Sequence, residues 1–530
     1  MAATGRSFIG FREGAKGDTT FRAYNPATGQ PLDPEFQAAT PEEVDLAARL
    51  AAEAFVSFRE LSGAAKAEFL NGIAKNIEAA TEQIVERGHL ETALPKPRLQ
   101  SETARTCNQL RLFAQVVQEG SWVNARIDRA DPNRKPLPKP DIRSMWRPLG
   151  PVVVFSASNF PLAFSVAGGD TASAFAAGNP VIVKAHSAHP GTSQIVGEAV
   201  RGAVRSRGLH EGVFSLIFGA GTSVGTQLVQ HPLIKAGGFT GSTGAGRALM
   251  NLAAARPEPI PFYGELGSTN PVFLLPGAMQ ARGAKIAEDL YGSFTLGAGQ
   301  FCTKPGLIFF SEGKTAAPFV GELKNKVAQA PEFALLTKGI SGDYDKEAQK
   351  RKQRRGLSVV AEGAQRSAAN PYSASAAVYQ TEISSFLAEP ELSEEHFGPS
   401  TLLIEYSNKE QILEAARKLE GHLTATIHGT EEDLREFSEL ISILENKVGR
   451  ILFNGFPTGV EVCHAMVHGG PYPASTDGRT TSVGTQAIYR FARPVCYQNL
   501  PDSALPAELK NANPLGVWRL VDGKMTQEAL

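Results

Sequence analysis

Cysteine is scarce in this chain, and the spacing of the few cysteines excludes the usual roles of paired thiols. The 530 residues contain four of them, Cys107, Cys302, Cys463 and Cys496. They form no Cys-x-x-Cys pair, and no nearby histidine completes a zinc-binding spacing. We therefore expect no metal centre, and structural thiols or one reactive thiol rather than disulfides.

An excess of charge of one sign and long apolar runs are also missing. The formal net charge of −1 gives no electrostatic reason to expect a nucleic-acid or anionic-membrane partner. Residues 1–17 contain no apolar run long enough for a signal peptide, and no later stretch reaches the length of a membrane span. We therefore expect a cytoplasmic enzyme that acts on a small molecule.

The chain does have a regular alternation of apolar runs and helix-like stretches. The apolar runs are 151–155, 181–184, 213–218 and 237–240, and the helix-like stretches are 165–177, 192–206 and 245–255. Such alternation predicts parallel strand pairing in a doubly wound α/β sheet, with a nucleotide as the usual ligand at the strand ends. A second alternating block runs from about 271 to 455.

Two further segments have their own signatures. A helix is predicted over 41–58, because Thr40 can cap it, Pro41 suits its first turn and Glu43 completes a capping box. The segment 131–151 is rich in proline and basic residues, and we interpret it as an extended linker or arm.

Three motifs contain side chains suited to catalysis, and each also has a purely structural interpretation. Cys302 lies in a glycine-rich turn, GAGQFCTKPG, where backbone N–H dipoles and Lys304 could favour the thiolate, although most cysteines are buried apolar residues. Glu265 in YGELGSTNP could be a general base with a raised pKa, or a solvated turn residue. Asn159 in SASNFPLAF could stabilise an oxyanion, or bond its own backbone.

Three more motifs are suited to a nucleotide. FTGSTGAG (239–246) follows a strand and opens a helix, whose free N–H groups attract phosphate, but it is neither a P-loop nor a GxGxxG fingerprint. Lys184 ends an apolar run in VIVKAHSAHPGTS, and EEHFGP (394–399) could line a ribose and a ring. Each of these could equally be a structural turn.

Taken in order, the six motifs resemble those of the aldehyde dehydrogenase superfamily, and the resemblance begins at YNPATGQPL (24–32) and covers most of the chain. It implies an aldehyde dehydrogenase-like α/β fold of two doubly wound domains and a β oligomerisation arm. The expected division is an NAD(P)-binding domain (1–130 and 151–264), a catalytic domain (265–479) and a bridging arm (131–150 and 480–530). A homodimer or homotetramer is expected from the same resemblance.

The resemblance also implies a role for each matched residue. Cys302 matches the nucleophile, Glu265 the general base and Asn159 the oxyanion-hole amide. Oxidation would proceed through a thiohemiacetal and a thioester on Cys302, and Glu265 favours water rather than coenzyme A as the final acceptor. One departure is Ser268, which stands where the base motif usually has a second glycine.

The resemblance places the cofactor along both halves of the chain. The matched positions are Lys184, Thr240, Gly241, Ser242 and Thr243 for the adenosine ribose and pyrophosphate, and Glu395 and Phe397 for the nicotinamide ribose and ring. Ser187 stands where the family usually has a glutamate that repels a 2′-phosphate. We therefore expect NADP+ as the preferred cofactor, with NAD+ as a possible second one.

The segments 468–484 and 490–501 are similar to the bacterial α-ketoglutaric semialdehyde (2,5-dioxopentanoate) dehydrogenase branch of the family. A charged semialdehyde needs a cationic anchor, for which Arg105 and Arg111 on a predicted helix (101–117) are the candidates. Residues on one face of a helix are three or four positions apart, whereas these arginines are six apart. We therefore expect at most one of the two arginines to point inward.

Other functions remain open at this point. An apolar funnel of Phe155, Phe160, Phe164 and Phe301 would suit a fatty or other hydrophobic aldehyde instead. A catalytically silent structural relative would be expected to have lost Cys302 or Glu265, and ester hydrolysis is a possible side activity of the same groups.

Overall fold

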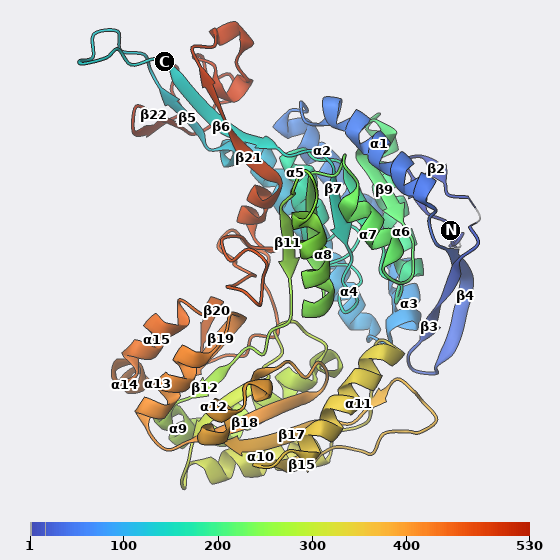
Figure 1. Cartoon of the computed structure of the whole chain (residues 1–530), viewed down its shortest axis with the longest axis vertical. Helices are drawn as coiled ribbons and strands as arrows, with labels where there is room; N and C mark the ends of the chain where they lie inside the picture. Colours follow the sequence, from blue (N-terminus) through green and yellow to red (C-terminus); the bar gives the residue numbers. More distant parts are fainter. Residues whose placement is uncertain (1–2, 16) are drawn as a thin grey trace.

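The computed structural model of the chain describes residues 3–15 and 17–530. Figure 1 shows two lobes stacked along the long axis and a thin layer that projects from the first lobe. Each lobe is built on a seven-stranded sheet, and the projecting layer is a five-stranded sheet. The predicted α/β fold class is confirmed.

The sheet of the first lobe has the strand order β11-β10-β7-β8-β9-β1-β2. The strands β7 to β11 pair in parallel, and β1 and β2 add an antiparallel edge. All four predicted apolar runs are strands of this sheet. The bounds are β1 Phe8–Ile9, β2 Arg12–Glu13, β7 Val152–Phe155, β8 Val181–Lys184, β9 Phe214–Ile217, β10 Ala236–Thr240 and β11 Phe262–Glu265.

Helices cover both faces of this sheet, because successive strand residues point to opposite sides. Val152 and Val154 of β7 belong to the apolar core under α2, α5 and α6. Val153 and Phe155 belong to the core under α1 and α7. The helices of this lobe are α1 Pro41–Phe58, α2 Gly63–Ala79, α3 Thr81–Thr92, α4 Lys96–Glu119, α5 Gly169–Ala177, α6 Pro190–Ser206, α7 Ser223–Gln230 and α8 Thr243–Ala254.

The ends of these helices follow from local chemistry. The predicted helix 41–58 is confirmed with its capping box, in which the Thr40 hydroxyl accepts from Glu43 N and the Glu43 carboxylate accepts from Thr40 N. The helix predicted over 165–177 begins later, at Gly169. Leu162 N and Ala163 N donate to the Glu102 carboxylate, each at 3.0 Å, so the preceding residues form turns instead.

The second lobe has the strand order β15-β17-β18-β13-β12-β19-β20, in which only β15 is antiparallel to its neighbour. Its strands are β12 Val272–Leu274, β13 Leu307–Ser311, β15 Leu357–Glu362, β17 Ala377–Glu382, β18 Ser400–Tyr406, β19 His422–His428 and β20 Val448–Phe453. Its helices are α9 Pro276–Thr295, α10 Ala316–Ala328, α11 Lys338–Gln353, α12 Ile383–Ala388, α13 Lys409–Lys418, α14 Glu431–Glu436 and α15 Ser438–Leu444.

The projecting sheet joins distant parts of the chain in the order β21-β6-β5-β22-β23. Its strands are β5 Ala125–Asp128, β6 Ile142–Pro148, β21 Ala492–Gln498, β22 Arg519–Val521 and β23 Lys524–Thr526. Strand β6 lies in the predicted arm segment 131–150, and it pairs antiparallel with β21 from the segment 480–530. The role of this sheet in assembly and the exact domain boundaries stay predictions.

Among the residues that the structure describes, no helix is both long and apolar enough to cross a membrane. The same residues contain no group of three or more histidine, cysteine, aspartate or glutamate side chains that could hold a metal ion.

Candidate active site

The carboxyl ends of the first sheet gather the residues predicted from its strand–turn motifs. Thr240 at the end of β10 is paired in register with Glu265 at the end of β11. Phe155 at the end of β7 is paired with Lys184 at the end of β8. The chain leaves β7 toward β8 on one side and returns to β10 on the other, so β7 and β10 flank a topological switch point. Ligands of open α/β sheets bind at such points.

The Cys302 turn faces this edge from the second lobe, just before β13. Gly297, Ala298 and Gly299 have φ of 57°, 59° and 68°, so the backbone before the thiol is left-handed over three residues. A Cβ on Gly299 would lie 2.1 Å from Gly398 O, so this position needs glycine. The turn is held from below because Asn270 Nδ2 donates to Cys302 O at 2.8 Å.

A backbone hydrogen bond acts to lower the pKa of the Cys302 thiol, as predicted, but Lys304 does not activate it. Lys304 points away from it and donates to His396 O at 2.7 Å and to Ser400 O at 2.9 Å. Burial, together with Glu265 and Glu395, raises the pKa of the Cys302 thiol to about 12. The free site therefore holds a protonated thiol at neutral pH.

A histidine that the sequence motifs did not predict as a site residue lies next to this thiol. His468 Nε2 is 3.4 Å from Cys302 Sγ. Burial lowers the pKa of His468 to about 3, with further lowering from nearby cations that include Arg450 and Arg105. The ring is therefore neutral in the free site, and its Nε2 lies within hydrogen-bond distance of the protonated thiol. The signal that could have found it is its place in the branch-specific segment 468–484.

Asn159 lies beside the thiol turn, because its Nδ2 donates to Gln300 O at 2.9 Å. An amide nitrogen has two hydrogens, so one remains to donate to an oxyanion. Phe160 packs edge-on against Phe164 and Phe301, with ring centroids 5.3 Å and 5.1 Å apart. Three of the four phenylalanines predicted for the funnel therefore form one cluster, whereas Phe155 packs against Phe239 and Phe262 instead.

Glu265 is buried and fully engaged. One carboxylate oxygen accepts from Arg490 Nη2, and the other accepts from Ser475 Oγ at 3.1 Å. Burial raises the pKa of Glu265 to about 7, against the lowering effect of Arg490. A carboxylate that titrates near neutrality is suited to general-base work. Arg490 was not predicted as a site residue, and the signal that could have found it is its place in the branch-specific segment 490–501.

The predicted cofactor residues are brought together around Gly267. A Cβ on Gly267 would lie 2.7 Å from a Glu395 carboxylate oxygen and 2.9 Å from Thr243 Oγ1, so Glu395 and Thr243 meet across this glycine. The other carboxylate oxygen of Glu395 is buried without a hydrogen-bond partner in the described part of the chain. Phe397 lies two residues further on and is partly buried.

The N-terminus of α8 is open to solvent. Ser242 is its N-cap and accepts from Ala245 N at 3.4 Å, while Gly241, Ser242 and Thr243 are exposed. Free N–H groups at a helix N-terminus attract phosphate. Burial lowers the pKa of Lys184 to about 8, which leaves the ammonium charged at neutral pH, and Ser187 nearby in sequence is partly buried. These residues fit a dinucleotide that runs from Lys184 to Glu395.

The structure separates the two arginines proposed as substrate anchors. Arg111 points to the surface, where it donates to both Glu78 carboxylate oxygens at 2.6 Å and 2.7 Å. Arg105 points inward, with its guanidinium carbon 5.4 Å from the Phe164 ring centroid and its Nε donating to Val460 O at 3.2 Å. Arg111 is therefore not at the site. This agrees with the prediction that two arginines six residues apart on one helix cannot both point inward.

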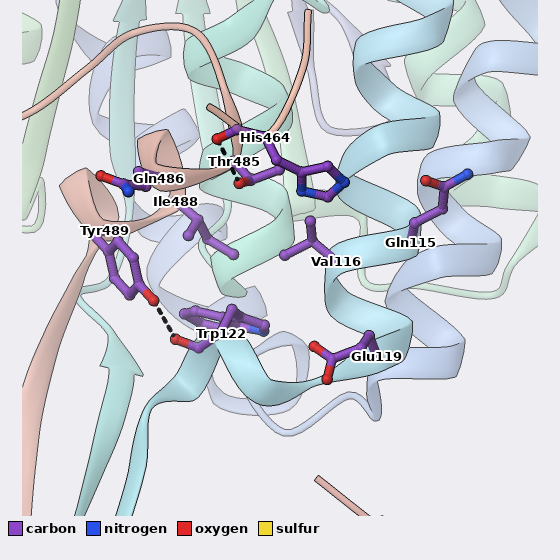
Figure 2. A pocket seen from close by; sticks show the side chains of 9 residues that line it. All are labelled: Gln115, Val116, Glu119, Trp122, His464, Thr485, Gln486, Ile488 and Tyr489. Atoms are coloured by element: carbon purple, nitrogen blue, oxygen red, sulfur yellow. Dashed lines mark hydrogen bonds between the residues drawn. The ribbon is translucent and has the colours of Figure 1, made fainter. Parts of the chain in front are cut away.

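A separate pocket, away from the candidate site, lies at the C-terminal end of α4. Figure 2 shows this pocket of about 450 Å³ between the end of α4 and the short 3₁₀ helix Thr485–Phe491. It contains none of the predicted catalytic or cofactor residues. Figure 2 also shows one contact that anchors the 3₁₀ helix, the hydrogen bond that the Tyr489 hydroxyl donates to Trp122 O at 2.9 Å.

The fold and the site together define a class, an α/β enzyme with a nucleotide-type sheet edge that faces a partly buried thiol. A model of the aldehyde dehydrogenase family matches residues 11–492. The chain belongs to the aldehyde dehydrogenase family, and it is an oxidoreductase that acts on aldehydes with a nicotinamide cofactor.

Two curated relatives are similar over nearly the whole chain. Alpha-ketoglutaric semialdehyde dehydrogenase 2 of Azospirillum brasilense is 48% identical over 525 residues, which cover 99% of this chain and 100% of that protein. Alpha-ketoglutaric semialdehyde dehydrogenase of Acinetobacter baylyi is 46% identical over 527 residues, which cover 99% of each chain.

Solved structures agree in fold. Gamma-glutamyl-gamma-aminobutyraldehyde dehydrogenase of Burkholderia cenocepacia superposes with a TM-score of 0.81 at 20% identity, covering 94% of this chain and 97% of that one. Betaine aldehyde dehydrogenase of Staphylococcus aureus in complex with NAD+ gives a TM-score of 0.80 at 18% identity, covering 94% and 96%. At this level of identity the likeness concerns the fold alone.

Proposed function

We propose that this enzyme oxidises α-ketoglutaric semialdehyde (2,5-dioxopentanoate) to 2-oxoglutarate, with NADP+ as the preferred cofactor and Cys302 as the nucleophile. The names of the two near-full-length relatives support this substrate. The observation in the structure that carries the proposal is the state of the Arg105 guanidinium.

Arg105 is a buried cation with unused donors. Its Nη1 and Nη2 are shielded from solvent and have no hydrogen-bond partner among the described residues. Burial lowers the pKa of Arg105, and the charges of Glu102 and Cys302 oppose that lowering, so the guanidinium lies near the thiol. An arginine fork binds a carboxylate through two N–H groups. The distal carboxylate of a dicarboxylic semialdehyde would satisfy both nitrogens.

The first chemical step is addition of the thiol to the aldehyde. His468 Nε2 is placed to take the proton from Cys302 Sγ. Because the thiol pKa is high and the histidine pKa is low, we infer that the proton leaves as the carbon–sulfur bond forms. The free Asn159 amide hydrogen donates to the oxyanion of the thiohemiacetal, an interaction of about 3 kcal/mol.

The cofactor residues fit a nicotinamide dinucleotide, which supplies a hydride acceptor when bound. Glu395 has an unpartnered carboxylate oxygen for the nicotinamide ribose, and Phe397 follows it for the ring. The exposed start of α8 offers N–H groups to the pyrophosphate. Loss of the hydride converts the thiohemiacetal into a thioester on Cys302.

The last step is hydrolysis of the thioester. Glu265 takes a proton from water, the resulting oxygen nucleophile adds to the acyl carbon, and the carbon–sulfur bond breaks to release the Cys302 thiolate, which takes up the proton held by Glu265. The pKa of Glu265 near 7 allows it to act as a base at neutral pH.

The preference for NADP+ rests on charge near the end of β8. Burial lowers the pKa of Lys184, and no carboxylate among the described residues opposes that lowering, so the ammonium has no acidic partner there. Ser187 can donate a hydrogen bond to a 2′-phosphate, where a glutamate would repel it. NAD+ can still be used, because the other contacts do not involve the 2′ position.

A hydrophobic aldehyde is the second candidate substrate. The observation that favours it is the cluster of Phe160, Phe164 and Phe301, which supplies an apolar wall next to the thiol. The two arginines beside this wall argue against it, because Arg98 lies 4.9 Å from the Phe160 ring centroid and Arg105 lies beside Phe164. A long alkyl chain would leave the Arg105 donors buried and unpaired.

A panel of aldehydes tests the proposal. The rates of NADP+ and NAD+ reduction are measured with 2,5-dioxopentanoate, succinic semialdehyde, pentanal and decanal. We expect the highest kcat/KM with 2,5-dioxopentanoate and NADP+. A preference for decanal over both charged semialdehydes would contradict the proposed substrate, and a higher kcat/KM with NAD+ would contradict the proposed cofactor.

A homodimer or homotetramer is the assembly that we propose. Large apolar side chains are exposed on the projecting sheet and the loop before it, with Trp518 45% and Met525 59% accessible in the single chain. Sedimentation equilibrium of the wild type and of Met525→Glu measures the state, and a wild-type monomer at micromolar concentration would contradict the assembly.

A further inference from the structure

The candidate base Glu265 is one end of a buried row of three charged side chains. Arg490 Nη2 donates to one carboxylate oxygen of Glu265, and Arg490 Nη1 donates to Asp170 Oδ1 at 3.1 Å. The side chains of Arg490 and Glu265 are each 1% exposed, and that of Asp170 is 10% exposed. The row is therefore shielded from solvent, where charge interactions are strong.

The three members come from three separate elements. Asp170 is in the first turn of α5, Glu265 ends β11, and Arg490 is in the 3₁₀ helix Thr485–Phe491. That helix is anchored by the Tyr489 hydroxyl on Trp122 O, as Figure 2 shows, and by burial of Ile488 and Phe491 in the main core. The guanidinium has little freedom to follow Glu265 if the carboxylate moves.

The row has two carboxylates and one cation. Arg490 therefore divides its charge between Asp170 and Glu265, and one negative charge is left without a full partner when both acids are ionised. Thr480 Oγ1 accepts from Arg490 Nε at 3.1 Å, so all three arms of the guanidinium are used. Such geometry fixes the direction of the Glu265 carboxylate.

Other ionisable groups also face this row. The Tyr263 ring lies 5.6 Å from the Arg490 guanidinium carbon, on the strand that carries Glu265. Asp477 and His468, in the segment before the 3₁₀ helix, also face the row: a hydrogen bond from Arg479 lowers the pKa of Asp477 and burial lowers that of His468, with a smaller lowering of both by the charge of Arg490. Cys302 faces Glu265 from the second lobe, where the Glu265 charge raises the pKa of the thiol.

We propose that Arg490, backed by Asp170, is a positioning residue for Glu265 that decides whether this base is charged when water attacks the thioester. The proposal rests on the proposed function, since it assigns a role in hydrolysis of the acyl enzyme. Neither residue touches the reacting atoms; both act through Glu265.

The arrangement predicts opposite effects for the two ends of the row. Arg490→Met leaves Asp170 and Glu265 buried together without a counter-charge, which raises the pKa of Glu265 further. Asp170→Asn removes the competing carboxylate and leaves the Arg490 charge to Glu265, which lowers the pKa of Glu265. The ordinary effect of one such charge is about 1–3 pH units. A residue needed only for packing would not shift the two profiles in opposite directions.

The experiment measures the hydrolysis step itself. The holoenzyme with NADP+ is mixed with one equivalent of 2,5-dioxopentanoate, quenched in acid after set times, and weighed as the intact chain by mass spectrometry. The decay of the acylated mass gives the hydrolysis rate at each pH from 5 to 9. The variants are Arg490→Met, Arg490→Lys and Asp170→Asn, with Gln486→Ala on the exposed side of the same 3₁₀ helix as the matched control.

We expect the acid limb of the wild-type profile to move up by about one pH unit or more in Arg490→Met and down in Asp170→Asn. The pH profile of Arg490→Lys should lie close to that of the wild type, and the profile of Gln486→Ala should match that of the wild type. If Arg490→Met fails to fold, Asp170→Asn still tests the proposal, because it keeps the volume of the side chain.

Two outcomes contradict the proposal for different reasons. If the wild type forms an acyl enzyme but Asp170→Asn leaves the profile unchanged or moves it upward, the role of Arg490 is refuted while the proposed function stands. If the wild type never carries an acyl mass, the thioester mechanism fails, and the role assigned to Arg490 fails with it.

Discussion

Replacement of Arg105 by methionine tests how the enzyme recognises a charged aldehyde. The methionine keeps an apolar stem of similar length beside Phe164, so the packing seen at 5.4 Å from the ring is largely retained. What is lost is the pair of buried donors, Nη1 and Nη2, which have no partner among the described residues. The variant therefore separates recognition of the carboxylate from the shape of the funnel.

The magnitude follows from the kind of bond removed. A hydrogen bond to a charged group contributes about 1.5–3 kcal/mol, and each 1.4 kcal/mol corresponds to a factor of about ten. The variant loses two hydrogen bonds to the substrate carboxylate, but it also no longer has the desolvation cost of a buried guanidinium. The expected net loss is about 2–3 kcal/mol of binding free energy. We therefore expect kcat/KM for 2,5-dioxopentanoate to fall roughly 30- to 150-fold, with most of the change in KM.

The assay compares this substrate with pentanal, which has the same chain length without the carboxylate. We expect kcat/KM for pentanal to change less than about threefold in Arg105→Met, because no bond to pentanal is lost. Arg111→Met is the control, since Arg111 lies on the same helix but is bound to Glu78 at the surface. Equal losses with both aldehydes, or no loss with either, would refute the anchoring role of Arg105.

Three further predictions concern the remaining groups of the site. Glu265→Gln should form the first equivalent of NADPH at the wild-type rate in stopped-flow traces but turn over roughly 100-fold more slowly, and a wild-type steady-state rate would exclude Glu265 as the base. His468→Gln should slow formation of that first equivalent by roughly 100-fold at pH 7, and the rate should recover as the pH rises. The reason is that the Cys302 thiol has a pKa of about 12, and only its thiolate form reacts without a base. A loss of rate that is independent of pH would contradict the proton transfer. Ser187→Glu should lower kcat/KM for NADP+ roughly tenfold or more and spare NAD+, and parallel losses with both cofactors would contradict the 2′-phosphate contact.

The parts of the site that could be predicted from the sequence are those whose chemistry lies in one short segment. Asn159, Glu265 and Cys302 each stand in a turn at a strand end, and the apolar runs around them mark those strands. The pairing of Thr240 with Glu265 shows why this works, since parallel strands bring their carboxyl ends to one edge. The helix 41–58 was predictable in the same way, because its capping box is local.

The parts that could not be predicted depend on contacts between distant segments. His468 is 166 residues from Cys302, and Arg490 is 225 residues from Glu265. No local spacing encodes either contact. The expected start of α5 was wrong for the same reason, since the backbone that precedes it is bound by Glu102, about 60 residues earlier in the chain. The expectation that Lys304 favours the thiolate was wrong because its ammonium group donates to the carbonyls of His396 and Ser400, about 90 residues later in the chain.

The most direct test of the central claim is the mass of the enzyme during turnover. Glu265→Gln with NADP+ and 2,5-dioxopentanoate is quenched in acid, weighed intact and then digested to locate the added group. The account predicts a gain of one 4-carboxy-4-oxobutanoyl group on Cys302, with no gain in Cys302→Ala. NADPH formation without any acyl group on Cys302, or an acyl group on another residue, would contradict it.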